Sequence, residues 1–180
     1  MRKTKKLTLS AMMIAMGVLF MTLGYFVEAL DLTVAALLSL VMVFMHIEVG
    51  SPYTFMVWLG TSLLGAVFFT GGTVWLTYLL VFGIYPVLKD YIERLPRWSQ
   101  ILLKLAYFNV ALLLLILATE LILGIPFVSL GEEYIQYKRL VMIGLAVAFN
   151  IAFIVYDIFI KLAARTYMLR LRARFARLLK

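Results

Sequence analysis

The sequence predicts an all-α integral membrane protein with six transmembrane helices and with both termini in the cytoplasm. Of the 180 residues, 65% are hydrophobic and only 14% are charged, and the mean hydropathy is +1.04. A water-soluble domain of this size cannot hide so much apolar surface. Because a spanning helix needs about 20 apolar residues, the chain has room for roughly six spans and for no separate soluble domain.

The first predicted span, 7–27, follows a basic segment that resembles the start of a secretory signal peptide. The residues after Phe26 lack a small-x-small cleavage pattern, and a second apolar run begins at once. We therefore expect the first helix to be retained.

Five further apolar runs are separated by Gly, Pro and charged residues, which are typical of positions where a chain leaves the bilayer. They predict spans at 30–47, 53–70, 73–88, 101–123 and 139–160. The run 73–88 is the least regular, because it is short and contains Gly83 and Pro86. We expect 1–180 to form a single domain that ends in a basic cytoplasmic tail, 161–180. That tail is suited to lie against anionic lipid headgroups, with docking of a partner as the alternative.

The orientation follows from the distribution of the 17 Lys and Arg residues. With six spans, all of them except Lys138 and Arg139 fall on the side that holds both termini. Loops rich in Lys and Arg stay in the cytoplasm. The net charge of +8 is thereby explained without nucleic-acid binding.

The residue types exclude most catalytic and metal chemistry. The chain has no Cys and a single His, His46, so cysteine nucleophiles, cysteine zinc sites and paired histidines are absent from the sequence. It contains neither a nucleophile elbow nor a phosphate-binding loop. We expect no enzymatic activity, no cofactor and no bound metal. We expect the polar ends of the His46 and Glu48 side chains to reach the membrane interface; the alternative is a role in proton transfer or metal binding.

Four polar residues interrupt the last two spans: Asn109, Glu120, Asn150 and Asp157. Such residues are costly in lipid and usually face the bundle interior or a cavity. The asparagines are expected to bond each other or a backbone carbonyl, with contact to a ligand as the alternative. Asp157 lies four residues before Lys161, and we expect an i,i+4 contact between them. Glu120, near the outer end of its span, has either a structural or a ligand-binding role.

Acidic and aromatic residues gather on the predicted outer side. They predict an outward-facing pocket for a small cationic or aromatic molecule, and the alternative is a solvated rim with interfacial aromatic residues. The residues concerned are Glu28, Asp31, Trp75, Glu120, Glu132, Glu133, Tyr134 and Tyr137.

Small residues follow two lines along the first span. Ala11 and Ala15 form an A-x-x-x-A step, and Ser10, Gly17 and Gly24 form a second line at heptad spacing. Small residues let another helix approach closely. They indicate either internal packing or a docking face for a separate membrane subunit.

The segment 5–17, KKLTLSAMMIAMG, resembles the opening of substrate-binding S components of energy-coupling-factor (ECF) transporters. The resemblance implies that Ala11 and Ala15 dock a transmembrane coupling subunit, and that two ATPases power import of a vitamin-like or metal solute across a bacterial cell membrane. It also implies an outward-opening pocket, which points by location to Glu28, Asp31, Glu120 and Asn150. The loop between the first two spans is shorter than the substrate lid of many members.

Two other interpretations remain open. One is a related family that shares the S-component scaffold without transport. The other is a non-catalytic membrane scaffold of the bacterial envelope elongation or division machinery, with the basic tail and the amphipathic segment 86–95 as its working parts.

Overall fold

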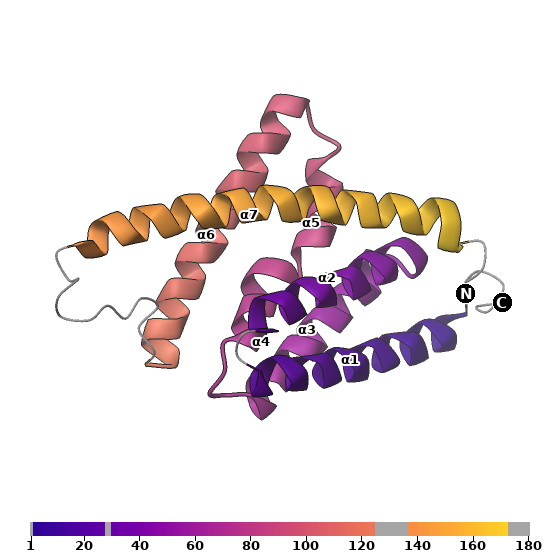
Figure 1. Cartoon of the computed structure of the whole chain (residues 1–180). Helices are drawn as coiled ribbons and strands as arrows, with labels where there is room; N and C mark the ends of the chain where they lie inside the picture. Colours follow the sequence, from indigo (N-terminus) through magenta and orange to yellow (C-terminus); the bar gives the residue numbers. More distant parts are fainter. Residues whose placement is uncertain (1, 28–29, 125–136, 173–180) are drawn as a thin grey trace.

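The computed structural model describes all residues except 1, 28–29, 125–136 and 173–180 (Figure 1). The described residues form helices and no strand, which confirms the all-α class. Four helices are long and apolar enough to cross a membrane: Lys3–Phe26, Asp31–Glu48, Arg97–Ile122 and Arg139–Arg170. The chain is therefore a helical membrane protein. Six crossings require two more within 49–96, the segment between the second and third of these helices.

Helices α1 (Lys3–Phe26), α2 (Asp31–Glu48) and α3 (Ser51–Phe68) pack side by side (Figure 1). The heptad line of small residues on α1 is buried, and a Cβ atom added to Gly17 would lie 2.7 Å from Cγ2 of Thr61 on α3. This line therefore serves internal packing, because it lets the backbones of α1 and α3 approach closely. Ala11 and Ala15 lie on the exposed side of α1.

The run expected at 73–88 is not one regular helix. It forms α4 (Val74–Thr77), a π-helical turn η2 (Tyr78–Phe82) and α5 (Tyr85–Ile92). The N–H of Gly83 donates to the carbonyl of Tyr78 at 2.7 Å, which closes a wide i→i−5 turn, and Pro86 contributes no backbone donor to the helix that follows.

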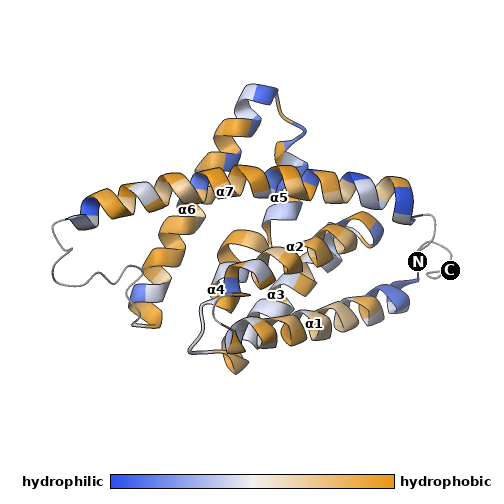
Figure 2. Ribbon diagram, viewed as in Figure 1, coloured by the Kyte–Doolittle hydropathy of each residue, from blue (hydrophilic) through white to orange (hydrophobic). Residues whose placement is uncertain are grey.

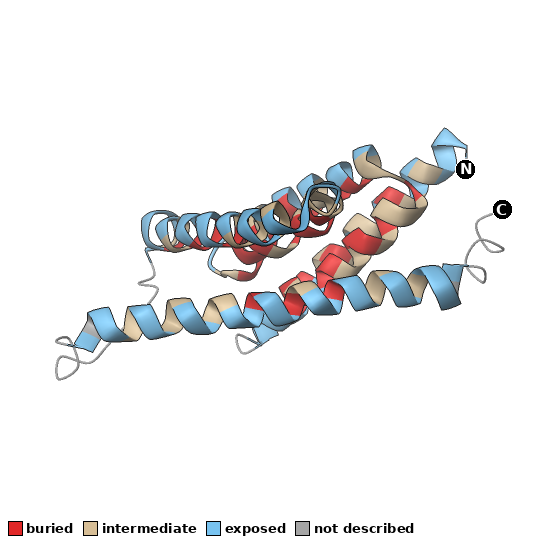
Figure 3. Cartoon of the chain, turned by 90° about the horizontal axis from the view of Figure 1, so that it is seen from above, coloured by how far each residue is buried: buried red, intermediate tan, exposed pale blue. Residues whose placement is uncertain are grey.

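The last two long helices are α6 (Arg97–Ile122) and α7 (Lys138–Thr166), which continues into the π-helical turn η4 (Tyr167–Leu171). Residues 161–171 of the expected tail thus prolong the last helix, because no Gly or Pro interrupts it. In Figure 1, α7 passes in front of α5 and α6, and α6 runs obliquely behind it. Buried positions concentrate where helices face one another, whereas α7 is mostly exposed (Figure 3).

The start of α1, the end of α2 and the end of η4 lie together, and we call this region the basic end. Lys6 Nζ donates to the carbonyl of Val49 at 3.3 Å, and Arg172 Nε donates to Glu48 Oε1 at 3.1 Å. The hydrophilic residues are concentrated at helix ends and at the α5–α6 turn (Figure 2). The opposite, loop end holds the end of α1, the start of α2 and the turn between α3 and α4.

Candidate functional site

A cavity of about 1010 Å³ lies between α2, α4, η2, α6 and α7. It begins at the loop end, where Tyr25 and Gly71 contribute to its wall, and it extends inward to Phe82 and Tyr156. Two helices supply regular stripes. On α6 these are Phe108, Leu112, Leu115 and Thr119, and on α7 they are Phe149, Ala152, Phe153 and Tyr156. Both stripes follow helical spacing, so each helix turns one face to the cavity.

The polar groups around the cavity are largely bonded to neighbouring protein atoms. Thr77 Oγ1 donates to the carbonyl of Thr73 at 2.9 Å, and Thr119 Oγ1 donates to the carbonyl of Ile116 at 2.9 Å. Asp31 Oδ2 accepts a hydrogen bond of 2.6 Å from Thr73 Oγ1, and its buried Oδ1 lies against Gly24 of α1. The carboxylate therefore joins α1, α2 and the start of α4, and the remaining wall is chiefly apolar and aromatic.

The expected binding residues are not gathered at one place. Asp31 lines the cavity, but Trp75 packs between the two hydrophobic clusters of the core and is not among the lining residues. Glu120 is exposed, while its neighbour Thr119 is buried at the cavity wall. Tyr137 is exposed at the start of α7. Residues Glu28, Glu132, Glu133 and Tyr134 lie outside the described part of the chain.

Asn150 is paired with Asn109 rather than placed at the cavity wall. Asn109 Nδ2 donates to Asn150 Oδ1 at 2.9 Å, and Asn150 Nδ2 donates to Asn109 Oδ1 at 3.2 Å. Each amide also donates to the carbonyl one turn back on its own helix. This confirms the expected bond between the two asparagines. All four amide N–H groups are used, so the pair forms a self-sufficient tie between α6 and α7.

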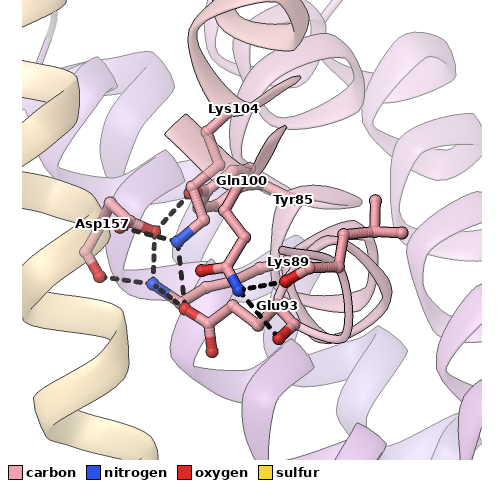
Figure 4. Close-up of polar contacts among 7 residues, drawn as sticks. Tyr85, Lys89, Glu93, Gln100, Lys104 and Asp157 are labelled. Carbon is pink, nitrogen blue, oxygen red and sulfur yellow. Dashed lines mark hydrogen bonds and ion pairs between the residues drawn. The ribbon is translucent and has the colours of Figure 1, made fainter. Parts of the chain in front are cut away.

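A second polar centre lies where α5, α6 and α7 meet, and the sequence did not predict it. Its charged members, here called the four-charge network, are Lys89, Glu93, Lys104 and Asp157 (Figure 4). Asp157 pairs with Lys89 and, at 3.0 Å, with Lys104. The expected contact of Asp157 with Lys161 is therefore wrong. The crossing helices bring two lysines to this carboxylate, whereas Lys161 is exposed.

The network closes on itself. Glu93 Oε1 lies 3.0 Å from Lys104 Nζ and 3.5 Å from Lys89 Nζ, so each cation contacts both anions. The Lys89 side chain is only 7% exposed, and its ammonium also donates to the backbone carbonyl of Asp157 at 2.6 Å. Two positive and two negative charges balance, which reduces the cost of burying them.

Neutral side chains complete this centre (Figure 4). The hydroxyl of Tyr85 donates to Asp157 Oδ1. Gln100 Nε2 donates to the carbonyls of Glu93 and Leu95 at 3.0 and 2.7 Å, and thereby fixes the turn between α5 and α6. Because the ring of Tyr85 packs 5.7 Å from that of Tyr156, the network lies directly beyond the inner end of the cavity.

His46, near the end of α2, contacts an acidic side chain of α5. Its Nε2 lies 3.4 Å from Asp90 Oδ2, and Arg94 donates to the same oxygen at 2.6 Å. Partial burial acts to raise the pKa of Asp90. The hydrogen bonds from Arg94 and His46 outweigh this effect and hold that pKa below its usual range. The contact with Asp90 accounts for the position of His46.

The described residues contain no group of three or more His, Asp or Glu side chains able to hold a metal ion. In the described part of the chain, the cavity provides a ligand-sized space and the four-charge network a largely buried polar centre. Comparison of the chain with protein-family models, curated proteins and solved structures gives no match.

Proposed function

We propose that this protein is a non-catalytic, solute-capturing membrane subunit of an ECF-type importer, with cytoplasmic termini in a bacterial plasma membrane. The observation that carries the proposal is the cavity of about 1010 Å³ between α2, α6 and α7. Its volume corresponds to the upper range of small-molecule sites, and such sites occur between the helices of bundles. The aromatic part of the wall comes mainly from α7, and Phe108 of α6 stacks on Phe153 of α7 at 4.3 Å.

The chemistry of the wall favours a small, largely apolar solute, for example one with an aromatic ring. Among the described lining residues there is no Lys or Arg, and the one carboxylate, Asp31, accepts a hydrogen bond from Thr73. An anionic solute would therefore lose its water without gaining a partner of opposite charge, and a cationic one would meet a single carboxylate at the loop end. Of the cationic or aromatic molecule expected from the outer side, this wall favours the aromatic one.

The exposed side of α1 supports docking of a coupling subunit. Ala11 and Ala15 lie one turn apart on the surface, and small side chains there allow close approach of a partner helix in the membrane. The buried heptad line on the same helix fixes the orientation of α1, so that this pair of alanines faces outward.

Solute capture is tested with a cavity-filling substitution. Ala152→Trp places a large ring within the cavity, and Val155→Trp places the same ring on a position of α7 that is 62% exposed. The tagged proteins are purified from native membranes in mild detergent, and retained small molecules are identified by mass spectrometry. We expect a solute with the parent protein and with Val155→Trp but not with Ala152→Trp. Absence of any retained solute from the parent, or its retention by Ala152→Trp, contradicts the proposal.

Docking is tested on the same purified samples through copurifying proteins. Ala11→Trp is expected to remove a transmembrane coupling subunit and its two ATPases without lowering the yield of folded protein. Met12→Trp is the control, because Met12 is a large exposed residue of the same helix outside the alanine step. Recovery of envelope-assembly proteins in place of ATPases favours the scaffold alternative.

A further inference from the structure

We propose that the four-charge network is a gate that closes the cavity toward the basic end, and that it opens when Asp157 exchanges its partners for Lys161. The inference rests on the proposed function, because it assigns the route by which a captured solute leaves. It concerns the residues beyond the inner wall of the cavity, which no step of solute capture uses.

The route from the cavity to the basic end is blocked by two successive layers. The first is aromatic. The ring of Tyr85 packs against Phe153 and Tyr156 at centroid distances of 4.9 and 5.7 Å, and it stacks on Tyr107 at 5.6 Å. The second layer is the network itself, to which the hydroxyl of Tyr85 is bonded through Asp157. Because Tyr85 belongs to both layers, they move together.

The network is divided unequally between the helices. Lys89 and Glu93 belong to α5 and Lys104 to α6, whereas α7 contributes Asp157 alone. Gln100 holds the α5–α6 turn together. Separation of α7 from the α5–α6 hairpin would therefore break every contact of the Asp157 side chain and leave Glu93 between the two lysines. Neither lysine would lose its last anionic partner.

Asp157 has an alternative partner on its own helix. Lys161 lies one turn further along α7, is exposed, and makes no ion pair within the described part of the chain. An Asp followed by Lys at i,i+4 is a favourable helical pair. In the closed state Asp157 pairs with Lys89 and Lys104, and in the open state it pairs with Lys161 while Glu93 keeps both other lysines. All four network charges are therefore paired in both states, as expected of an element with two stable arrangements. Removal of a partner from a buried ion pair is strongly unfavourable, so intermediate states are disfavoured.

The proposal makes opposite predictions for the two carboxylates. Asp157→Asn removes two buried ion pairs from the closed state but only one exposed pair, that with Lys161, from the open state, so it should open the gate. Glu93→Gln leaves Asp157 with its three donors but removes the anion that keeps Lys89 and Lys104 paired after opening. It should therefore leave the gate closed. A purely structural network would loosen in both variants.

Access can be measured directly because the chain has no native cysteine. Ala152→Cys provides a reporter within the cavity wall. Vesicles of defined orientation are treated with a membrane-impermeant thiol reagent, and the labelling rate is measured from each face. We expect labelling from the loop-end face alone in the reporter protein. Addition of Asp157→Asn should raise the rate from the basic-end face by about tenfold or more, as expected when a minor state becomes populated.

Controls separate gating from general damage. Arg165→Gln removes a charge two turns after Asp157 from an exposed position and should change neither rate. Tyr85→Phe is the second variant, for use if Asp157→Asn does not accumulate as folded protein. It removes only one of the three donors to Asp157, so it should give a smaller rise in the labelling rate from the basic-end face. Equal basic-end rates for Asp157→Asn and Glu93→Gln, or no rise in either Asp157→Asn or Tyr85→Phe, overturn the proposal.

The test also distinguishes the gate from solute capture, because thiol labelling reports access whether or not a solute is bound. Retention of a solute without the difference between the two carboxylate variants refutes the gate alone. The labelling difference without any retained solute refutes solute capture, and the switch in accessibility then requires another purpose.

Discussion

Gly17 and Ala15 are two small residues on α1 with opposite environments. A Cβ atom at Gly17 would lie 2.7 and 3.0 Å from the Cγ2 and Oγ1 atoms of Thr61, a distance that forces the neighbouring helix to shift. Gly17→Leu is therefore expected to destabilise the protein by about 1–3 kcal/mol, the usual cost of overpacking. Ala15→Leu, on the exposed side, should have little effect. Thermal unfolding in detergent, followed by size-exclusion chromatography, provides the measurement. Equal losses in both variants would show that α1 is oriented differently.

Asp90 predicts a small pH-dependent contribution to stability. Its pKa in the folded state lies below the ordinary value of about 3.9, because the hydrogen bonds from Arg94 and His46 outweigh the effect of burial. The contribution is thus fully present above that ordinary value and is lost as the pH falls through the lower folded value. The melting temperature of the parent should exceed that of Asp90→Asn above about pH 4, where the carboxyl is ionised in both the folded and the unfolded states. The margin should shrink as the pH falls below that value, and a margin that does not shrink there contradicts the assignment.

Among the polar residues of the last two spans, the sequence predicts the partner of each asparagine correctly and the partner of Asp157 incorrectly. The asparagine pair follows from two amides placed in adjacent spans. The four-charge network does not, because Lys89 and Lys104 also satisfy the simple expectation for cations of a cytoplasmic loop. Their burial depends on where α7 crosses the α5–α6 hairpin, which is a long-range contact. Asp157 was consequently assigned to the nearest lysine in sequence.

At the scale of elements, the asparagine pair ties together two helices that otherwise make limited contact. Asn150→Leu should destabilise the protein, since it leaves the amide of Asn109 without its partner in an apolar environment. In a double-mutant cycle with Asn109→Leu, we expect a coupling of about 0.6–2 kcal/mol, the range for hydrogen bonds between membrane helices. The unfolding free energy of all four proteins is measured in mixed micelles. Strict additivity of the two single losses would show that the bonds between the amides contribute nothing.

Helix existence was easier to predict than helix continuity. The long apolar runs predict α1, α2 and α6 close to their observed bounds and the start, but not the end, of α7, since length and hydrophobicity decide such segments. The run 73–88 contains the two signals that break it, Gly83 and Pro86. A Cβ at Gly83 would lie 2.6 Å from Cδ1 of Trp58 and 2.7 Å from the carbonyl oxygen of Tyr78, so tertiary packing also requires the irregular geometry. The position of the π-helical turn depends on that packing.

At the scale of the whole molecule, the cavity was predicted only in outline. An outward-opening site was expected from acidic and aromatic residues near helix ends. The observed wall consists instead of apolar stripes deeper in α6 and α7, and Asp31 is the only one of the expected residues in the described part of the chain that lines it. Helical spacing marks each stripe in the sequence, but the outer, lipid-facing stripes are equally apolar. Only the packing order of the helices shows which stripe faces inward.

The number of membrane crossings decides on which side of the membrane the α3–α4 turn lies. If six segments cross, the turn at 69–73 lies on the opposite side from the basic end. If only the four longest helices cross, the whole of 49–96 lies on one side. Both arrangements place the start of α1 and the end of η4 on the same side, so reporters fused to the termini cannot distinguish them.

Two single cysteines in this cysteine-free chain separate the two arrangements. Gly71→Cys is compatible with the fold, because the nearest side-chain atom to an added Cβ, the hydroxyl of Tyr25, is 3.7 Å away. Ser51→Cys replaces a hydroxyl by a thiol at the start of α3, near the basic end. With six crossings, an impermeant thiol reagent should label Gly71→Cys only from outside intact cells and Ser51→Cys only after the cells are opened. Labelling of both from the cytoplasmic face would contradict six crossings and also the packing of Gly71 against Tyr25 at the loop end, and it would exclude capture of an external solute through this mouth of the cavity.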